Sequence, residues 1–342
     1  MRRVWIAAAV AGVLLAHPAP GDAATASVTE SCGKGGGVTC FAHLWVAAAP
    51  GERNDVRVTP VGDDLLVSDS TPVIAEETCE ARPDGSALCH PRNGRPWIVA
   101  HLELGDLDDS AAVAGNLVGA AYDGGSGDDR LLGGPAGSSF RGGSGDDVMV
   151  GGEGDDFFDE GGAPNGNDVM SGGGQTTFGN PPLRMGDVVS YADRVRPVRA
   201  VIGGRAEGGE RGEHDRIGAD VEVLLGGHAG DTLTGDASAD YLNGAHGDDV
   251  LRGRGGEDLL YGSRGNDRIF DGRGIDRVRA GPGRDRIRSG AGPDDIAAGP
   301  GNDVIWTRGG PEPVDCGGGW DRVFASPLDQ LTEDCERRMR RR

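Results

Sequence analysis

The sequence predicts an all-β chain that winds as a solenoid of stacked nine-residue repeats. From Gly226 to Trp306, the 342-residue chain divides into nine nonapeptides without an insertion. Each nonapeptide has an aspartate at its sixth place and an aliphatic residue at its eighth. Because neighbouring side chains of a strand point to opposite faces, one inward residue per repeat is what a three-residue strand supplies. The glycines in the rest of each repeat suit a turn.

The sixth-place aspartates fall into two blocks. The earlier block has registers that begin at Gly124, Gly133, Gly142 and Gly151, with Ser138 in place of one aspartate and a three-residue insertion before the last turn. We take the sixth-place aspartates of both blocks as candidate metal ligands: Asp129, Asp147, Asp156, Asp168, Asp231, Asp240, Asp249, Asp258, Asp267, Asp276, Asp285, Asp294 and Asp303.

Composition indicates that a cation is needed to fold this chain. Glycine accounts for 63 residues, aromatic residues for 5%, and the formal net charge is −21. Such a chain buries little apolar surface, so a packed core alone is a weak driving force for folding. The acidity argues against nucleic acid and anionic membranes as partners, and favours cations.

Calcium is the ion that the repeated turns suit best. Carboxylates and turn carbonyls are hard oxygen ligands, and Ca²⁺ takes 6–8 of them. Neighbouring turns of a stack lie about 4.8 Å apart, so an ion fits between Asp267 on one coil and Asp285 on the next. Without the ion, two carboxylates at about 5 Å repel by roughly 3 kcal/mol at an effective dielectric near 20. Asp271, at the first place of its turn, is expected to contribute little.

The repeat resembles a known family. The pattern GGxGxDxUx, as in "GGSGDDVMV" at 142–150, is similar to the RTX, or hemolysin-type, calcium-binding repeat over roughly 105–306. The chain also resembles actinobacterial secreted calcium-binding proteins. The resemblance implies a right-handed parallel β-roll with calcium between its turns. The alternatives are a disordered Gly/Asp-rich linker and a calcium-free β-helix held by its hydrophobic ladder.

Three departures from the pattern weaken particular sites. The turns at 226–231 and 235–240 lack glycine at the fourth place, and Ser138 has no carboxylate. Four arginines flank inward aliphatic residues and are expected to face outward, where they screen the aspartates or form a basic stripe for a ligand: Arg277, Arg279, Arg286 and Arg288.

The first 26 residues are predicted to be a secretory signal peptide. Arg2 and Arg3 precede the apolar run Val4–Ala16, and small residues follow, which places cleavage between Ala23 and Ala26. The apolar run is too short to span a bilayer, and the alternative is a buried N-terminal helix. The protein is therefore expected to be extracellular and not membrane-spanning.

Six cysteines in an exported chain indicate disulfides. They form three pairs that are local in sequence, Cys32/Cys40, Cys79/Cys89 and Cys316/Cys335. Fifteen connectivities are possible, and we favour the local one. Free thiols or metal ligands are the alternatives, and no CxxC spacing supports zinc.

The sequence predicts six segments. They are the signal peptide at 1–26, an N-terminal β cap with two cystine loops at 27–104, the first repeat block at 105–171, irregular solenoid coils at 172–225, the second block at 226–306, and a C-terminal cap with a basic tail at 307–342. In the N-terminal cap, strands are expected at Val56–Thr59, Leu65–Val67 and Trp97–Leu104.

No catalytic motif is recognisable, so the protein is expected to be a structural or interaction module and not an enzyme. GxSxG, HExxH and P-loop sequences are all absent. The alternative is a protein that binds or modifies extracellular polysaccharide along one solenoid face, with a cell-surface glycan as partner. The outward aromatics fall at different places of the repeat, so no groove is predicted: Tyr241, Tyr261, Phe270 and Trp306.

One histidine pair is a minor candidate for a transition-metal site. His228 and His246 share the third place of turns two repeats apart and are expected to stack. Two solvated turn histidines are the simpler interpretation.

Overall fold

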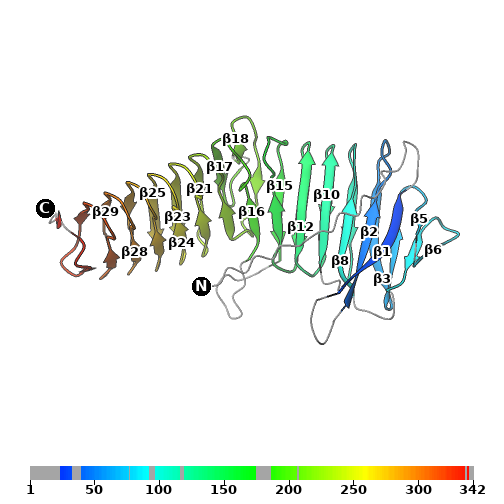
Figure 1. Cartoon of the computed structure of the whole chain (residues 1–342), viewed down its shortest axis with the longest axis horizontal. Coiled ribbons are helices and arrows are strands. Elements are labelled where there is room, and N and C mark those ends of the chain that lie inside the picture. Colours follow the sequence, from blue (N-terminus) through cyan, green and yellow to red (C-terminus); the bar gives the residue numbers. More distant parts are fainter. Residues whose placement is uncertain are drawn as a thin grey trace.

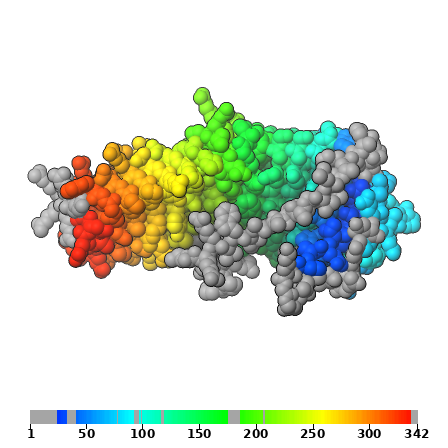
Figure 2. All heavy atoms as spheres, viewed as in Figure 1, coloured from blue at the N-terminus to red at the C-terminus, as the bar shows by residue number. Residues whose placement is uncertain are grey.

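The computed structural model describes residues 24–32, 40–76, 78–91, 97–115, 119–174, 186–205, 208–335 and 337–338. Within these ranges all regular structure is β, and the strands stack along the long axis of an elongated body (Figure 1). Figure 2 shows the green, yellow and red parts of the sequence following one another along that axis, whereas a cyan part lies at the far end, beyond the blue part. The prediction of a parallel β-solenoid is therefore confirmed. No described helix has the length and apolar character needed to span a bilayer.

One face of the solenoid is a 15-stranded sheet, the long sheet, that runs through the whole described chain. Its strands are β1 (Thr25–Cys32), β2 (Cys40–Ala47), β5 (Ile74–Ala75), β8 (Trp97–Glu103), β10 (Ala120–Ser126), β12 (Ser138–Ser144), β14 (Phe157–Asp159), β16 (Val188–Ser190), β20 (Val223–Leu225), β22 (Tyr241–Asn243), β24 (Leu259–Tyr261), β26 (Arg277–Arg279), β28 (Asp295–Ala297), β30 (Pro313–Asp315) and β32 (Gln330–Leu331).

The opposite face is divided into two sheets of nine strands each. The N-terminal sheet contains β3 (Asp55–Val61), β4 (Asp64–Ser68), β6 (Cys79–Ala81), β7 (Ala87–Cys89), β9 (Ser110–Val113), β11 (Arg130–Leu132), β13 (Val148–Gly152), β15 (Val169–Gly173) and β19 (Arg216–Ile217). The C-terminal sheet contains β17 (Val198–Val201), β18 (Gly209–Glu210), β21 (Thr232–Thr234), β23 (Val250–Gly255), β25 (Arg268–Arg273), β27 (Arg286–Arg288), β29 (Val304–Trp306), β31 (Arg322–Phe324) and β33 (Arg337–Arg338).

In the second block, each strand pairs in parallel with the strand two repeats further on. Ile269 of β25 is aligned with Ile287 of β27, and Ile287 with Ile305 of β29. These eighth-place residues are fully buried, whereas their two neighbours in each strand are not. The core is therefore a narrow ladder of one side chain per strand. In the first block the ladder is partly aromatic, and Phe140 stacks on Phe158 with ring centroids 5.0 Å apart.

Antiparallel strands close the N-terminal end. β1 pairs with β2, and β3, β4, β7 and β6 form an antiparallel series in the N-terminal sheet. The three strands expected in this region are present as β3, β4 and β8. At the other end the winding continues beyond Trp306, because β30 and β31 extend the two faces in parallel.

Two of the predicted disulfides are present, Cys79–Cys89 and Cys316–Cys335. Cys32 is also disulfide-bonded, and its backbone is aligned with that of Cys40 across β1 and β2. The Cys40 side chain lies outside the described residues, as do residues 1–23 with most of the predicted signal peptide, and the end of the basic tail.

Candidate metal-binding columns

All thirteen predicted aspartates are buried, with exposures of 0 to 2%. Each precedes the strand triplet of its repeat, so the turn directs it inward while the next residue but one enters the core ladder. The N–H of Asp249 donates to Oδ1 of Asp267, and the N–H of Asp267 donates to Oδ1 of Asp285, both at 2.8 Å. The aspartates therefore form columns in which each carboxylate, except that of Asp240, accepts a hydrogen bond from the coil before it.

The second carboxylate oxygen is usually left without a partner. Oδ2 is buried and accepts no hydrogen bond in eleven of the thirteen: Asp129, Asp147, Asp156, Asp168, Asp249, Asp258, Asp267, Asp276, Asp285, Asp294 and Asp303. In the turn that ends at Asp267, this oxygen faces the first-place glycine, and a Cβ on Gly262 would overlap it. Buried oxygens without donors are unfavourable unless a cation neutralises them, so the columns fit a hard metal ion.

Burial also raises the pKa of these carboxyl groups. The pKa of Asp249 rises to about 8 and that of Asp285 to about 7, with burial as the main cause and the charges of neighbouring aspartates as a smaller one. Hydrogen bonds from the preceding coil oppose the rise. Removal of these carboxylates from water therefore raises their pKa more than the repulsion between them that the sequence indicates.

The two turns that lack a fourth-place glycine hold their carboxylates differently. Oδ2 of Asp231 accepts a hydrogen bond of 2.6 Å from the N–H of Gly227, and Oδ2 of Asp240 accepts one of 2.8 Å from the N–H of Asp236. Both oxygens of Asp231 are thus occupied, because its Oδ1 also accepts from the N–H of Val198, whereas Oδ1 of Asp240 is buried without a partner. These contacts give a physical reason to expect a weaker site at Asp231.

The columns contain acidic residues that the repeat register did not include. The N–H of Asp168 donates to Oδ1 of Asp215 at 3.1 Å, and the N–H of Asp303 donates to Oδ1 of Asp321 at 2.8 Å. The residues missed in this way are Asp109, Asp187, Asp215, Glu222 and Asp321. Each precedes an apolar residue by two positions, so the acid-x-apolar triplet alone could have located them.

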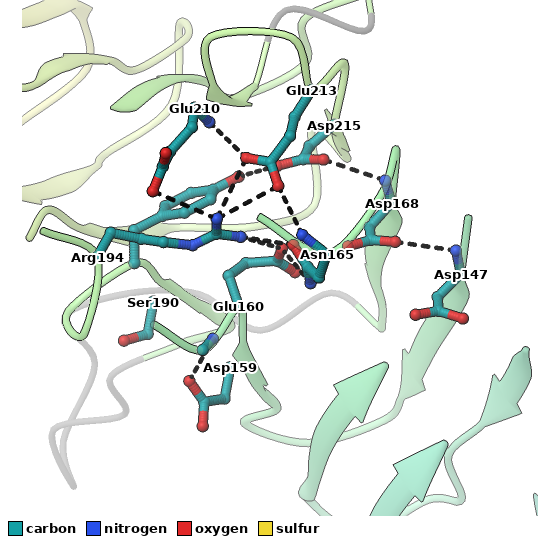
Figure 3. Close-up of polar contacts among 12 residues, drawn as sticks. Asp147, Asp159, Glu160, Asn165, Asp168, Ser190, Arg194, Glu210, Glu213 and Asp215 are labelled. Atoms are coloured by element: carbon teal, nitrogen blue, oxygen red, sulfur yellow. Dashed lines mark hydrogen bonds and ion pairs between the residues drawn. The ribbon is translucent and has the colours of Figure 1, made fainter. Parts of the chain in front are cut away.

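A buried arginine lies where the N-terminal sheet gives way to the C-terminal sheet. Arg194 follows β16 and is fully buried among acidic and amide side chains (Figure 3). Its guanidinium contacts Glu160 at 3.7 Å, Glu210 at 3.6 Å, Glu213 at 3.3 Å and Asn165 at 2.5 Å. Nearby, the Tyr191 hydroxyl donates to Asp215 at 2.9 Å. Arg194 thus provides a permanent cation inside an acidic junction, and no sequence pattern indicated this.

The described residues contain two groups of three carboxylates whose ligand oxygens all lie within 4.8 Å of one another. One comprises Glu160, Asp168 and Asp215, and the other comprises Asp271, Asp276 and Asp294. The second group differs from the expectation that Asp271 contributes little, because Asp271 is fully buried and its ligand oxygen lies close to those of Asp276 and Asp294. The side chain at the first place of this turn therefore points into the solenoid.

Two of the outward arginines pair with a surface aspartate outside the columns. Arg277 and Arg279 both pair with Asp295 on the surface of the long sheet, at 3.4 and 2.6 Å. Screening of the sixth-place aspartates by these two side chains is therefore not what the structure shows. His228 and His246 stack as expected, with ring centroids 5.2 Å apart.

The fold and the columns together define a parallel β-solenoid whose turns carry paired carboxylates suited to a hard cation. Residues 123–158, 225–260, 261–296 and 289–310 match the RTX calcium-binding nonapeptide repeat in four copies. These residues therefore form RTX, or hemolysin-type, repeats, and the solenoid that contains them is a calcium-binding β-roll module. A search of curated proteins finds no match to the chain.

Proposed function

We propose that this protein is exported and that calcium folds its β-roll outside the cell, where it acts as a structural or interaction module without catalytic activity. The observation that carries the proposal is the set of buried Oδ2 atoms that have no hydrogen-bond donor. A cation that binds only the folded columns stabilises the fold by mass action. Because extracellular calcium modules bind at about 10⁻⁴–10⁻³ M, the chain would fold mainly after export.

Export is supported by the apolar N-terminal run and by the disulfides. Disulfides persist in oxidising compartments. β1 begins at Thr25, and Ala26 is buried opposite Val46. We therefore place cleavage of the signal peptide before Thr25, within the predicted window, because removal of Ala26 would shorten an internal strand.

Two measurements on the secreted full-length chain test this function. Mass spectrometry should find an N-terminus at or before residue 25 and the three local disulfides. Equilibrium dialysis should find several calcium ions per chain, with magnesium binding far more weakly because it tolerates less irregular coordination. Failure to bind calcium at about 10⁻³ M would contradict the proposal.

A second candidate function is the binding of an anionic glycan along the C-terminal sheet. The ninth-place side chains of successive strands on this sheet are either arginine or aromatic: Arg252, Phe270, Arg288, Trp306 and Phe324. The guanidinium of Arg252 lies 5.4 Å from the Phe270 ring centroid, and that of Arg288 lies 5.4 Å from the Trp306 ring centroid. Phe270 and Trp306 were expected at different places, but both flank Arg288 in this one column. Aromatic faces and guanidinium groups at regular spacing suit sugar rings that carry carboxylate or sulfate groups.

A glycan array with calcium present tests this second function. The wild-type chain should bind acidic polysaccharides in preference to neutral ones, and salt should weaken binding. Arg288→Ser should reduce the signal, whereas Arg277→Ser on the long sheet should not, because Arg277 is already paired with Asp295. Equal binding to acidic and neutral glycans, or equal effects of the two variants, would rule this function out.

A further inference from the structure

The first place of a repeat normally carries no charge. In the first five repeats of the second block it is glycine, and in three later repeats it is Ala280, Ser289 or Ala298. These three side chains are buried, so the first place faces the inside of the turn. At Asp271 the same inward position carries a carboxylate, which is 0% exposed. The turn from 271 to 276 therefore contains one acid more than the pattern requires.

Asp271 lies against a pair of column aspartates. Asp276 ends its own turn, and the N–H of Asp276 donates to Oδ1 of Asp294 on the next coil at 3.1 Å. Ligand oxygens of the three carboxylates all lie within 4.8 Å of one another. That separation is short enough for a single ion with oxygen ligands at about 2.3–2.6 Å to contact all three.

One oxygen of each carboxylate in this cluster is buried without a donor. Oδ1 of Asp271 accepts hydrogen bonds from the N–H groups of Gly272 and Gly290, at 2.5 and 2.6 Å. Oδ2 of Asp271 is buried without a partner, and so is Oδ2 of both Asp276 and Asp294. Backbone hydrogen bonds thus fix the Asp271 carboxylate and leave its other oxygen unpaired, which points to a cation as the missing partner.

The acidic cluster at the sheet junction provides a contrast within the same chain. There, Arg194 lies 3.7 Å from Glu160, so a guanidinium partly neutralises the three carboxylates. Among the ion pairs of the described residues, none reaches Asp271, Asp276 or Asp294. The junction has its own cation, whereas the 271–294 cluster needs one from solution.

We propose that Asp271, Asp276 and Asp294 form a three-carboxylate calcium site that binds the ion more tightly than the two-aspartate pairs of the other turns. This inference rests on the proposed calcium-binding function and extends it. The affinity of calcium sites in proteins rises with the number of charged ligands and with their rigidity, and this site exceeds its neighbours in charge. It should therefore fill first as calcium rises and should order the coils around it.

Calcium titration by calorimetry on the full chain tests the proposal, with Asp271→Ala as the main variant. Alanine is already the first-place residue at Ala280 and Ala298, so the coil should still fold, which circular dichroism in saturating calcium would verify. The wild type should show one calcium bound at least ten-fold more tightly than the rest. Asp271→Ala should lose that step and keep the others. Asp271→Asn preserves the shape of the side chain and should show the same loss even if the alanine variant folds poorly.

The reciprocal variant is Ala280→Asp, which places a first-place carboxylate beside the Asp285 and Asp303 pair. This variant should bind a second calcium ion with high affinity in the same titration. If the wild type binds calcium but Asp271→Ala and Asp271→Asn leave its tightest step unchanged, the inference is wrong and the general function stands. If the wild type binds no calcium, the proposed function itself is wrong.

Discussion

The N–H of Asp249 donates a hydrogen bond of 2.8 Å to Oδ1 of Asp267, and Oδ2 of Asp267 is buried without any partner. One oxygen thus joins two coils of the solenoid while the other remains available to a cation. The same arrangement recurs along the columns, so the residues that hold successive coils together are also the residues that need an ion. Folding and calcium binding are therefore expected to be one event.

Loss of a column carboxylate should weaken calcium binding most where that carboxylate has a buried oxygen without a hydrogen-bond partner. Asp267→Asn keeps an oxygen for the Asp249 hydrogen bond and removes a ligand charge, so affinity at its two neighbouring sites should fall about ten-fold, equivalent to about 1.4 kcal/mol. Asp231→Asn is the matched control, because both oxygens of Asp231 already accept backbone hydrogen bonds, Oδ1 from Val198 and Oδ2 from Gly227. Calorimetry that gave the same loss for both variants would mean that the acidity acts as a diffuse field and not through defined sites.

Low pH should partly stabilise the fold when calcium is absent. The pKa of Asp249 is 3.8 in the unfolded reference and rises to about 8 in the folded chain, mainly through burial. A carboxyl group with a raised folded pKa stabilises the fold at low pH, and this contribution is lost as pH rises through that window. In excess chelator, the β signal in circular dichroism should therefore be stronger near pH 5 than near pH 8. A β signal that increased with pH in chelator would contradict this prediction.

Because the core contains one inward side chain per strand, each of these side chains should contribute strongly to the free energy of unfolding. Leu260 is fully buried between Leu242 and Val278 on neighbouring coils. Leu260→Ala should lower the free energy of unfolding by about 2–5 kcal/mol in saturating calcium, as other buried leucine deletions do. Leu259→Ala is the control, since that side chain is only half-buried at the next position. Urea denaturation would compare them, and equal losses would contradict the ladder as the core.

The disulfide Cys316–Cys335 should hold the last coils in place. It links the segments that follow β30 and β32, two strands that pair through Val314 and Leu331. Replacing both cysteines with serine should destabilise this end by about 2–4 kcal/mol, and limited proteolysis should then cut beyond Trp306 first. Proteolysis that instead began in the second repeat block would show that the disulfide supports more than the terminal coils.

Much of the fold was predictable because the repeat is local. The triplet of aspartate, any residue and an apolar residue places both the strand and its inward side chain, as Asp267 and Ile269 illustrate. Prediction of the stacked partner was reliable only where the spacing is constant. Asp249 and Asp267 are 18 residues apart, whereas Asp156 stacks on Asp187 at a separation of 31 and Asp168 on Asp215 at 47.

The rest could not be read from the sequence because it depends on how the coils close. The loop between β16 and β17 brings Arg194 to acids up to 34 residues away, and no period relates them. Asp271 was misjudged for a different reason. Its place in the repeat is normally glycine, so the pattern gave no indication of where a first-place side chain would point, and only the structure shows that it points inward.

The most direct test of the account is far-ultraviolet circular dichroism of the secreted chain at pH 8 while calcium is removed with a chelator and then restored. We expect the β signal and the resistance to protease to be lost in chelator, and to return cooperatively as calcium is added, because each bound ion orders a turn that also lines the next site. A chain that kept its full β signal and its protease resistance in excess chelator would contradict the claim that calcium folds the roll.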